Sequence, residues 1–137
     1  MDNKITQFIF DKVGVPKSQK YLDLASLKHK LISGNVANVS TPGYKSKNFD
    51  FHSEFKKVSG EGSSLRGVTT NPYHIPTGSH EAKPPKVHSK RVEIGEMNSV
   101  DIDKEISTLA QNELLYEVGA TLLQRKFEGL RKAIQSK

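Results

Sequence analysis

The sequence predicts a mainly α-helical fold. Long N- and C-terminal helices pack as a coiled-coil-like hairpin, and an extended loop region rich in Gly and Pro, with short β pieces, joins them. Apolar residues recur at intervals of three and four between residues 18 and 39 and again between 101 and 134. This is the spacing of a helix with one buried face. Clusters of Gly, Pro and Ser between these patterns predict the loop region.

These patterns divide the chain into four segments. We expect a flexible N-terminal segment over 1–17, the N-terminal helix with its elbow over 18–44, an extended loop and short β region over 45–100, and the C-terminal helix over 101–137. The two helical segments form one structural unit, because each leaves an apolar stripe that must be covered.

Composition limits the classes of function. The chain has 137 residues, of which only 34% are hydrophobic, and it has no Cys. A single small domain fits this length, whereas an enzyme with a deep buried active site needs a larger apolar core. The absence of Cys excludes disulfides, a Cys nucleophile and thiolate metal sites. A net charge of +6 keeps a nucleic-acid or lipid-binding module as an alternative.

Targeting signals are also informative. The first residues carry Asp2 and Asp11 and one short apolar patch, and no stretch approaches the roughly 20 apolar residues of a membrane span. A cleaved secretory signal needs a basic start and a longer apolar run. We therefore expect a chain that stays in the cytoplasm or leaves it by a route without a cleaved signal.

The N-terminal helix is predicted from Ser18, a suitable N-cap, to Val39. Pro16 precedes it, and the residue before Pro42 is disfavoured in helical conformation, which ends it. Leu24, Leu27 and Leu31 form its packing stripe, and a second apolar stripe runs beside them.

The end of this helix is the most specific segment of the chain. Asn35 and Asn38 lie one turn apart and can bind backbone groups at the exit turn. Thr41, Pro42, Gly43 and Tyr44 follow, in which Pro stops the helix, Gly permits a positive φ and Tyr can pack back. These six residues predict a rigid elbow that directs the next segment of chain.

The loop region between the helices contains two further candidates. Residues 65–70 and 90–94 could pair as a hairpin, because both are short and β-like. Phe49, Phe51 and Phe55 alternate with polar residues, which predicts a short strand or a docking strip.

The C-terminal helix is predicted to begin after an Asp101 N-cap and to run about 34 residues, on the order of 50 Å. Its expected packing residues recur every three or four positions: Ile102, Ile106, Leu109, Tyr116, Leu123, Phe127, Leu130 and Ile134. Seven large apolar groups of this helix would stabilise by roughly 10–21 kcal/mol if fully buried. The shorter N-terminal helix cannot cover them all, so the sequence predicts assembly with other chains through helix packing.

Catalytic and metal sites are not predicted. The five His residues have no metal-ligand spacing, and no catalytic or phosphate-binding motif occurs. The carboxylates Asp101, Asp103 and Glu105 fit the N-terminus of a helix better than a metal site. We therefore expect no cofactor, no metal and no enzymatic activity.

Residues 37–44 resemble the A-N-x-x-T-P-G-Y signature of the flagellar rod and hook axial protein family, and residues 98–105 and 109–116 resemble the C-terminal helix of the same family. The resemblance covers about residues 20–50 and 98–134. The length of the chain and its C-terminal motif resemble a proximal rod subunit more than the longer hook and distal rod members.

This resemblance implies a function and a location. The chain would be a structural subunit of the proximal rod of the bacterial flagellar basal body, in the periplasm, helping to transmit torque from the MS ring to the hook. Its implied partners are copies of itself, the rod proteins FlgC, FlgF and FlgG, the adaptor FliE and the MS ring. Export would use the flagellar type III apparatus. A FlgC-like rod subunit remains an alternative.

Overall fold

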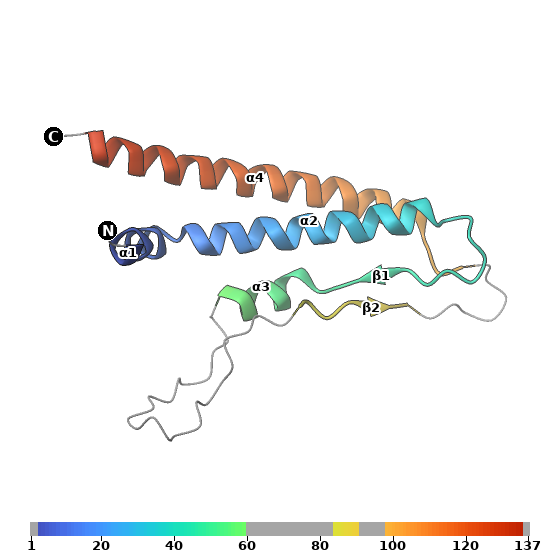
Figure 1. Ribbon diagram of the computed structural model, residues 1–137. Helices are drawn as coiled ribbons and strands as arrows, with labels where there is room; N and C mark the ends of the chain where they lie inside the picture. The colour runs from blue at the N-terminus through green and yellow to red at the C-terminus, as the bar shows by residue number, and fades with distance from the viewer. Residues whose placement is uncertain (1–2, 60–83, 91–97, 136–137) are drawn as a thin grey trace, which may run out of the picture.

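The computed structural model describes residues 3–59, 84–90 and 98–135 (Figure 1). The elements follow in the order α1 (Asn3–Val13), α2 (Val15–Ala37), β1 (Lys47–Asn48), α3 (Phe51–Ser59), β2 (His88–Ser89) and α4 (Ile102–Gln135). Helices α2 and α4 lie side by side and run antiparallel, while α3 and the two short strands lie along the other side of α2. The predicted mainly α fold is confirmed.

The N-terminal part differs from the expectation. Residues 3–13 form α1 rather than an unstructured segment, and α2 begins at Val15 rather than at Ser18. Gly14 separates the helices with a φ of 74°, a conformation that Gly adopts without steric cost. Pro16 lies inside the first turn of α2, where its missing N–H would have had no helical partner.

Helix α4 matches its prediction closely. It spans 34 residues. The Asp101 side chain accepts a hydrogen bond from the Lys104 backbone N–H at 3.1 Å, and the Asp101 carbonyl accepts from the Glu105 N–H at 2.9 Å. The N-cap predicted from the sequence is therefore present, and it fixes where the helix starts.

The aromatic segment around residues 49–55 is the clearest correction. The strand alternative is wrong, because Phe51–Ser59 form α3; as a docking strip, Phe51 and Phe55 do pack on Tyr21 of α2. Asp50 caps this helix, since its carboxylate accepts from the backbone N–H groups of His52 and Ser53 at 3.0 and 3.2 Å. The bond from the Ser53 N–H, followed by that from His52, holds the pKa of Asp50 below its ordinary value. A local cap outweighs the alternating pattern of a short segment.

The core is small and centred on α2. Its most buried apolar side chains are Val15, Leu24, Ala25, Ile32 and Phe49. Helix α3 packs on α2 through aromatic rings: Tyr21 meets Phe51 and Phe55 edge to face, with ring centroids 5.1 and 5.4 Å apart. Burial raises the pKa of the Tyr21 hydroxyl. Four of these five buried apolar side chains belong to α2.

Among the described residues, the β structure is one antiparallel pair, Lys47 with Ser89 and Asn48 with His88. The hairpin predicted for 65–70 and 90–94 lies outside the described residues except at Lys90, whose backbone N–H donates to Ser46 at 2.9 Å. Of the helices described, none is both long and apolar enough to cross a membrane.

Candidate functional site: the elbow and the helix seam

Asn35 is the centre of the elbow. Its side chain is 1% exposed and all its hydrogen-bonding capacity is used toward other segments. The amide nitrogen donates to the Lys47 carbonyl at 2.9 Å and to Glu105 Oε1 at 3.1 Å. The amide oxygen accepts from the Lys47 N–H at 2.9 Å and from the Tyr44 hydroxyl at 3.3 Å. One side chain therefore joins α2, the chain after the elbow and the first turn of α4.

The remaining elbow residues form the turn itself. Asn38 donates from Nδ2 to the Gly34 carbonyl at 2.8 Å and accepts from the Thr41 hydroxyl at 3.2 Å. Gly43 has a φ of 73°, so the predicted positive φ is present. Pro42 is exposed at the surface of the turn, and the Tyr44 N–H donates to Thr41 at 3.3 Å. All six predicted elbow residues lie in one connected turn.

Asn98 and Ser99, which were not predicted to belong to the elbow, also bind its residues. Asn98 donates from its side chain to the Val39 carbonyl, and Ser99 is 5% exposed. The Ser99 hydroxyl accepts from the Ser46 N–H at 2.8 Å, and the Ser99 N–H donates to the Tyr44 carbonyl at 3.2 Å. The sequence gives little indication of these hydrogen bonds, because the residues that form them are more than fifty positions apart along the chain. They attach the start of α4 to the turn.

The seam between α2 and α4 has an unexpected polar series. Glu105, Asn112, Gly119 and Lys126 recur every seven residues, and each contacts α2 or the residue before it. None is a large apolar residue, so a search for apolar residues at helical spacing does not identify them. The described contacts explain each member in turn.

Asn112 is 2% exposed and donates from Nδ2 to the Ala25 carbonyl at 3.0 Å, while its side-chain oxygen has no hydrogen-bond partner in the described part of the chain. A helical carbonyl beside the seam is an acceptor that only a donor side chain can use. A buried amide in such a seam favours one register of the helices at a cost in stability.

Gly119 lets the two helices approach closely. A Cβ at this position would lie 2.9 Å from ring carbons of Tyr21 and 3.1 Å from Leu22. Only Gly fits such an approach without movement of the neighbouring side chains. This explains a Gly in the interior of a long helix.

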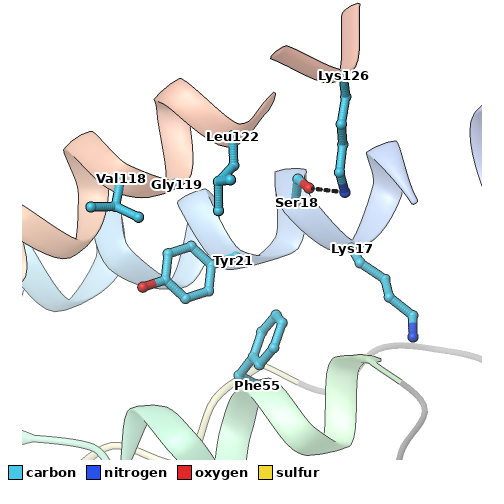
Figure 2. Close-up of a pocket in the computed structure, with 8 residues that line it drawn as sticks. All are labelled: Lys17, Ser18, Tyr21, Phe55, Val118, Gly119, Leu122 and Lys126. Carbon is cyan, nitrogen blue, oxygen red and sulfur yellow. Dashed lines mark hydrogen bonds between the residues drawn. The ribbon is translucent and has the colours of Figure 1, made fainter. Parts of the chain in front are cut away.

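Lys126 fastens α4 to the junction of α1 and α2. Its ammonium donates to the Gly14 carbonyl at 3.0 Å and to the Ser18 hydroxyl at 2.8 Å. Figure 2 shows the bond from Lys126 to Ser18 at one end of a hollow, which has a volume of about 320 Å³ and is also lined by Tyr21, Phe55 and Leu122. The walls are mainly apolar side chains, with the ammonium of Lys126 at the rim.

The predicted packing residues are divided between the seam and the surface. Leu24 is buried, and Leu27, Leu31, Leu109, Leu123 and Leu130 are half-buried. The exposed members are Ile102, Ile106, Tyr116, Phe127 and Ile134. A single neighbouring helix covers only part of the circumference of α4. The polar series that faces α2 most closely therefore lies one residue before the predicted apolar stripe in the sequence.

Within residues 3–59, 84–90 and 98–135, no three His, Asp or Glu side chains are placed to hold a metal ion. The described hollows lie between helices, and the one beside Glu113 and Glu117 is lined mostly by polar side chains. The arrangement fits a protein that binds other helices.

Comparison with known proteins gives a consistent result. No protein-family model matches the chain. It is 31% identical over 127 residues to the flagellar basal body rod protein FlgB of Escherichia coli, covering 86% of this chain and 90% of that protein. FlgB of Cereibacter sphaeroides is 32% identical over 126 residues, with 91% and 94% covered. FlgB of Bacillus subtilis is 31% identical over 114 residues, with 82% and 86% covered. The chain belongs to the FlgB family of flagellar basal body rod proteins.

Proposed function

We propose that the chain is a non-enzymatic structural subunit of the proximal rod of the bacterial flagellum, which polymerises through helix packing and helps to transmit torque from the MS ring to the hook. The observation that carries this proposal is the match to FlgB over 90% of the length of the Escherichia coli protein. A match of that extent covers most of both proteins, rather than a single shared motif.

The exposed apolar surface of α4 supports assembly. Nine large hydrophobic residues of α4 are exposed, and Ile134 is 80% exposed. Burial of apolar area is the main driving force for association, at about 25 cal/mol for each Å². A single chain leaves this area in water, whereas a bundle of neighbouring helices removes it.

The elbow has a mechanical role in this proposal. Asn35, Ser99 and Tyr44 hold the end of α2, the start of α4 and the outgoing chain together through buried or half-buried hydrogen bonds. A load applied to the outgoing segment would pass into both helices at once, because no flexible linker intervenes at this point.

The partners follow from the same family. The subunit would contact copies of itself, the rod proteins FlgC, FlgF and FlgG, the adaptor FliE and the MS ring. It would reach the periplasmic rod through the flagellar type III export apparatus without a cleaved signal.

Deletion of the gene tests the function. The deletion strain should lack complete basal bodies and should not swim, and the wild-type gene should restore both. Electron microscopy of isolated basal bodies and a motility assay provide the readouts. Complete basal bodies in the deletion strain would refute the proposal. A Pro42→Ala/Gly43→Ala variant that restores normal swimming would refute only the role of the elbow.

A further inference from the structure

Helix α4 carries opposite net charge on its two halves. Residues 102–118 contain four carboxylates and one Lys, and residues 119–135 contain four basic side chains and one Glu. Glu105 and Lys126 are engaged inside the hairpin, through Asn35 and through Gly14 and Ser18. The charges that remain on the outside still divide into an acidic half and a basic half.

These charges lie beside an apolar flank of the helix pair. Three hollows follow the same side of α4, of about 310, 460 and 460 Å³. The first is lined by Glu113 and Glu117, and the other two share Phe127 and Arg131. We call this surface the flank strip; its residues, which recur at intervals of three, four or seven, are Ile106, Glu113, Glu117, Ala120, Phe127 and Arg131. A strip of this spacing faces one direction on a helix.

The side chains of the flank strip are largely exposed, although the ring of Phe127 also meets that of Phe10 on α1, with centroids 6.5 Å apart. Ile106 is 52% exposed and Phe127 is 43% exposed. Glu113, Glu117 and Arg131 are exposed as well. The strip therefore combines unburied apolar groups with a carboxylate pair in the first half of α4 and a guanidinium in the second.

We propose that the flank strip binds the flank strip of a second copy of this chain, in parallel and displaced along the helix by fourteen positions, about 21 Å. In this register Glu117 of one copy lies beside Arg131 of the next, and Ile106 lies against the small side chain of Ala120. The parallel orientation rests on the proposed function, because a displaced head-to-tail contact leaves both ends open and continues into a filament.

Helix-dipole stabilisation does not account for the charge pattern. The dipole acts on charges within the first and last turns, and Glu113 and Glu117 lie in the interior of α4. Two neighbouring carboxylates on an exposed interior turn repel each other mildly within the monomer. In the proposed register Arg131 of a second copy offsets the charge of Glu117, while Glu113 lies beside Phe127.

Charge exchange tests the contact. Glu117→Arg and Arg131→Glu each place like charges at the contact, so each should raise the concentration at which the purified chain associates by about tenfold at low salt. The combined variant restores opposite charges, so its association should return to within about threefold of wild type. Sedimentation velocity measures association, and circular dichroism checks that helix content is unchanged.

The double variant decides between the proposal and an effect inside one chain. If the charges act only on their own helix, the two substitutions add and the double variant associates worst, which overturns the proposal. A wild-type chain that remains monomeric up to its solubility limit also overturns it, as does association that is unaffected by salt.

Cysteine cross-linking tests the orientation, and the chain contains no Cys of its own. Under oxidation, Ile106→Cys/Ala120→Cys should give a ladder of linked oligomers, because each copy joins the next. The matched variant Gln124→Cys should give none. An antiparallel pair would satisfy the same charges but bring the two copies of position 124 together, so a Gln124→Cys dimer overturns the parallel arrangement.

Basal-body assembly in the deletion strain tests the proposed function independently of the flank strip. If the wild-type gene restores basal bodies in the deletion strain while Glu117→Arg/Arg131→Glu shows no rescue of association, only the flank strip contact is refuted. If deletion leaves basal bodies intact, the proposed function is refuted whatever the charge variants show.

Discussion

The two ends of the α2–α4 hairpin are built differently. At the elbow end, Asn35 and Ser99 are both at least 95% buried and hydrogen-bond across segments. At the opposite end, α1 meets α4 through Phe10 and Phe127, whose ring centroids are 6.5 Å apart, and both rings remain partly exposed. The comparison indicates that one end is specified within the chain, whereas the other leaves surface for neighbours. Four pairs of substitutions test it.

Asn35→Ala should have the largest effect. It removes four hydrogen bonds and leaves the backbone groups of Lys47 without their partner. A buried polar group without a partner costs about 1–3 kcal/mol, so we expect a loss of roughly 3–5 kcal/mol in the free energy of unfolding. Urea denaturation followed by circular dichroism measures it.

Asn35→Asp is the matched control. It keeps the acceptor oxygen but loses the donor and places a second carboxylate beside Glu105, so it should be destabilised as well, and less so at low pH. A loss below about 1 kcal/mol in Asn35→Ala would mean that the elbow is not the rigid end.

Gly119→Ala tests the middle of the seam. The added methyl group would meet the Tyr21 ring at 2.9 Å, and overpacking of this kind costs about 1–3 kcal/mol. Gly129 is the control in the same helix, since an added Cβ there meets nothing within 4 Å. Gly129→Ala should stabilise by about 0.5–1 kcal/mol through helix propensity. Thermal unfolding of the pair measures both, and equal shifts of the same sign would contradict the close approach.

Gly43→Ala and Gly14→Ala compare the two ends with one substitution. Both Gly residues have a φ near 74°, which costs a residue with a Cβ roughly 1–2 kcal/mol. At Gly43 the rigid elbow prevents relaxation, so the cost should appear in full. At Gly14 the new side chain also meets Lys126 Nζ at 3.3 Å, but α1 can move, so the cost should be smaller. A larger loss at Gly14 would reverse the comparison.

Lys126→Met should have the smallest effect. It removes two hydrogen bonds from a half-buried ammonium, worth about 1 kcal/mol together once competition from water is included. Amide hydrogen exchange of residues 14–18 should increase while that of the elbow is unchanged. Arg125→Met, at an exposed neighbouring position, should stay within about 0.5 kcal/mol of wild type. Faster exchange at the elbow would show that the two ends are coupled.

Local signals in the sequence were read correctly where one residue and its near neighbours decide the structure. The Asp101 cap, the length of α4 and the turn of Thr41 to Tyr44 all depend on contacts within a few positions. Of the two alternatives for the aromatic segment, the strand was wrong, because the Asp50 cap is a local signal for a helix that the alternating pattern obscured.

Residues whose role depends on distant partners could not be found in this way. Nothing near Asn98 or Ser99 indicates that they bind Val39 and Ser46. The polar seam series was also missed, because Asn112 and Gly119 gain their meaning only from Ala25 and Tyr21 on the other helix. A stripe of apolar residues identifies a helix with a buried side, but not which neighbour covers which part.

The sequence by itself determined that the protein has two long helices, a sharp elbow between them and more apolar surface than one chain can cover. Helical periodicity, capping and the special geometry of Pro and Gly operate over a few residues, so they can be read along the chain. Only the tertiary structure decided the rotation of α4 about its axis. It turned a polar, seven-residue series toward α2 and left Ile106, Phe127 and Ile134 exposed, because hydrogen bonds and close approach across the seam depend on both helices together.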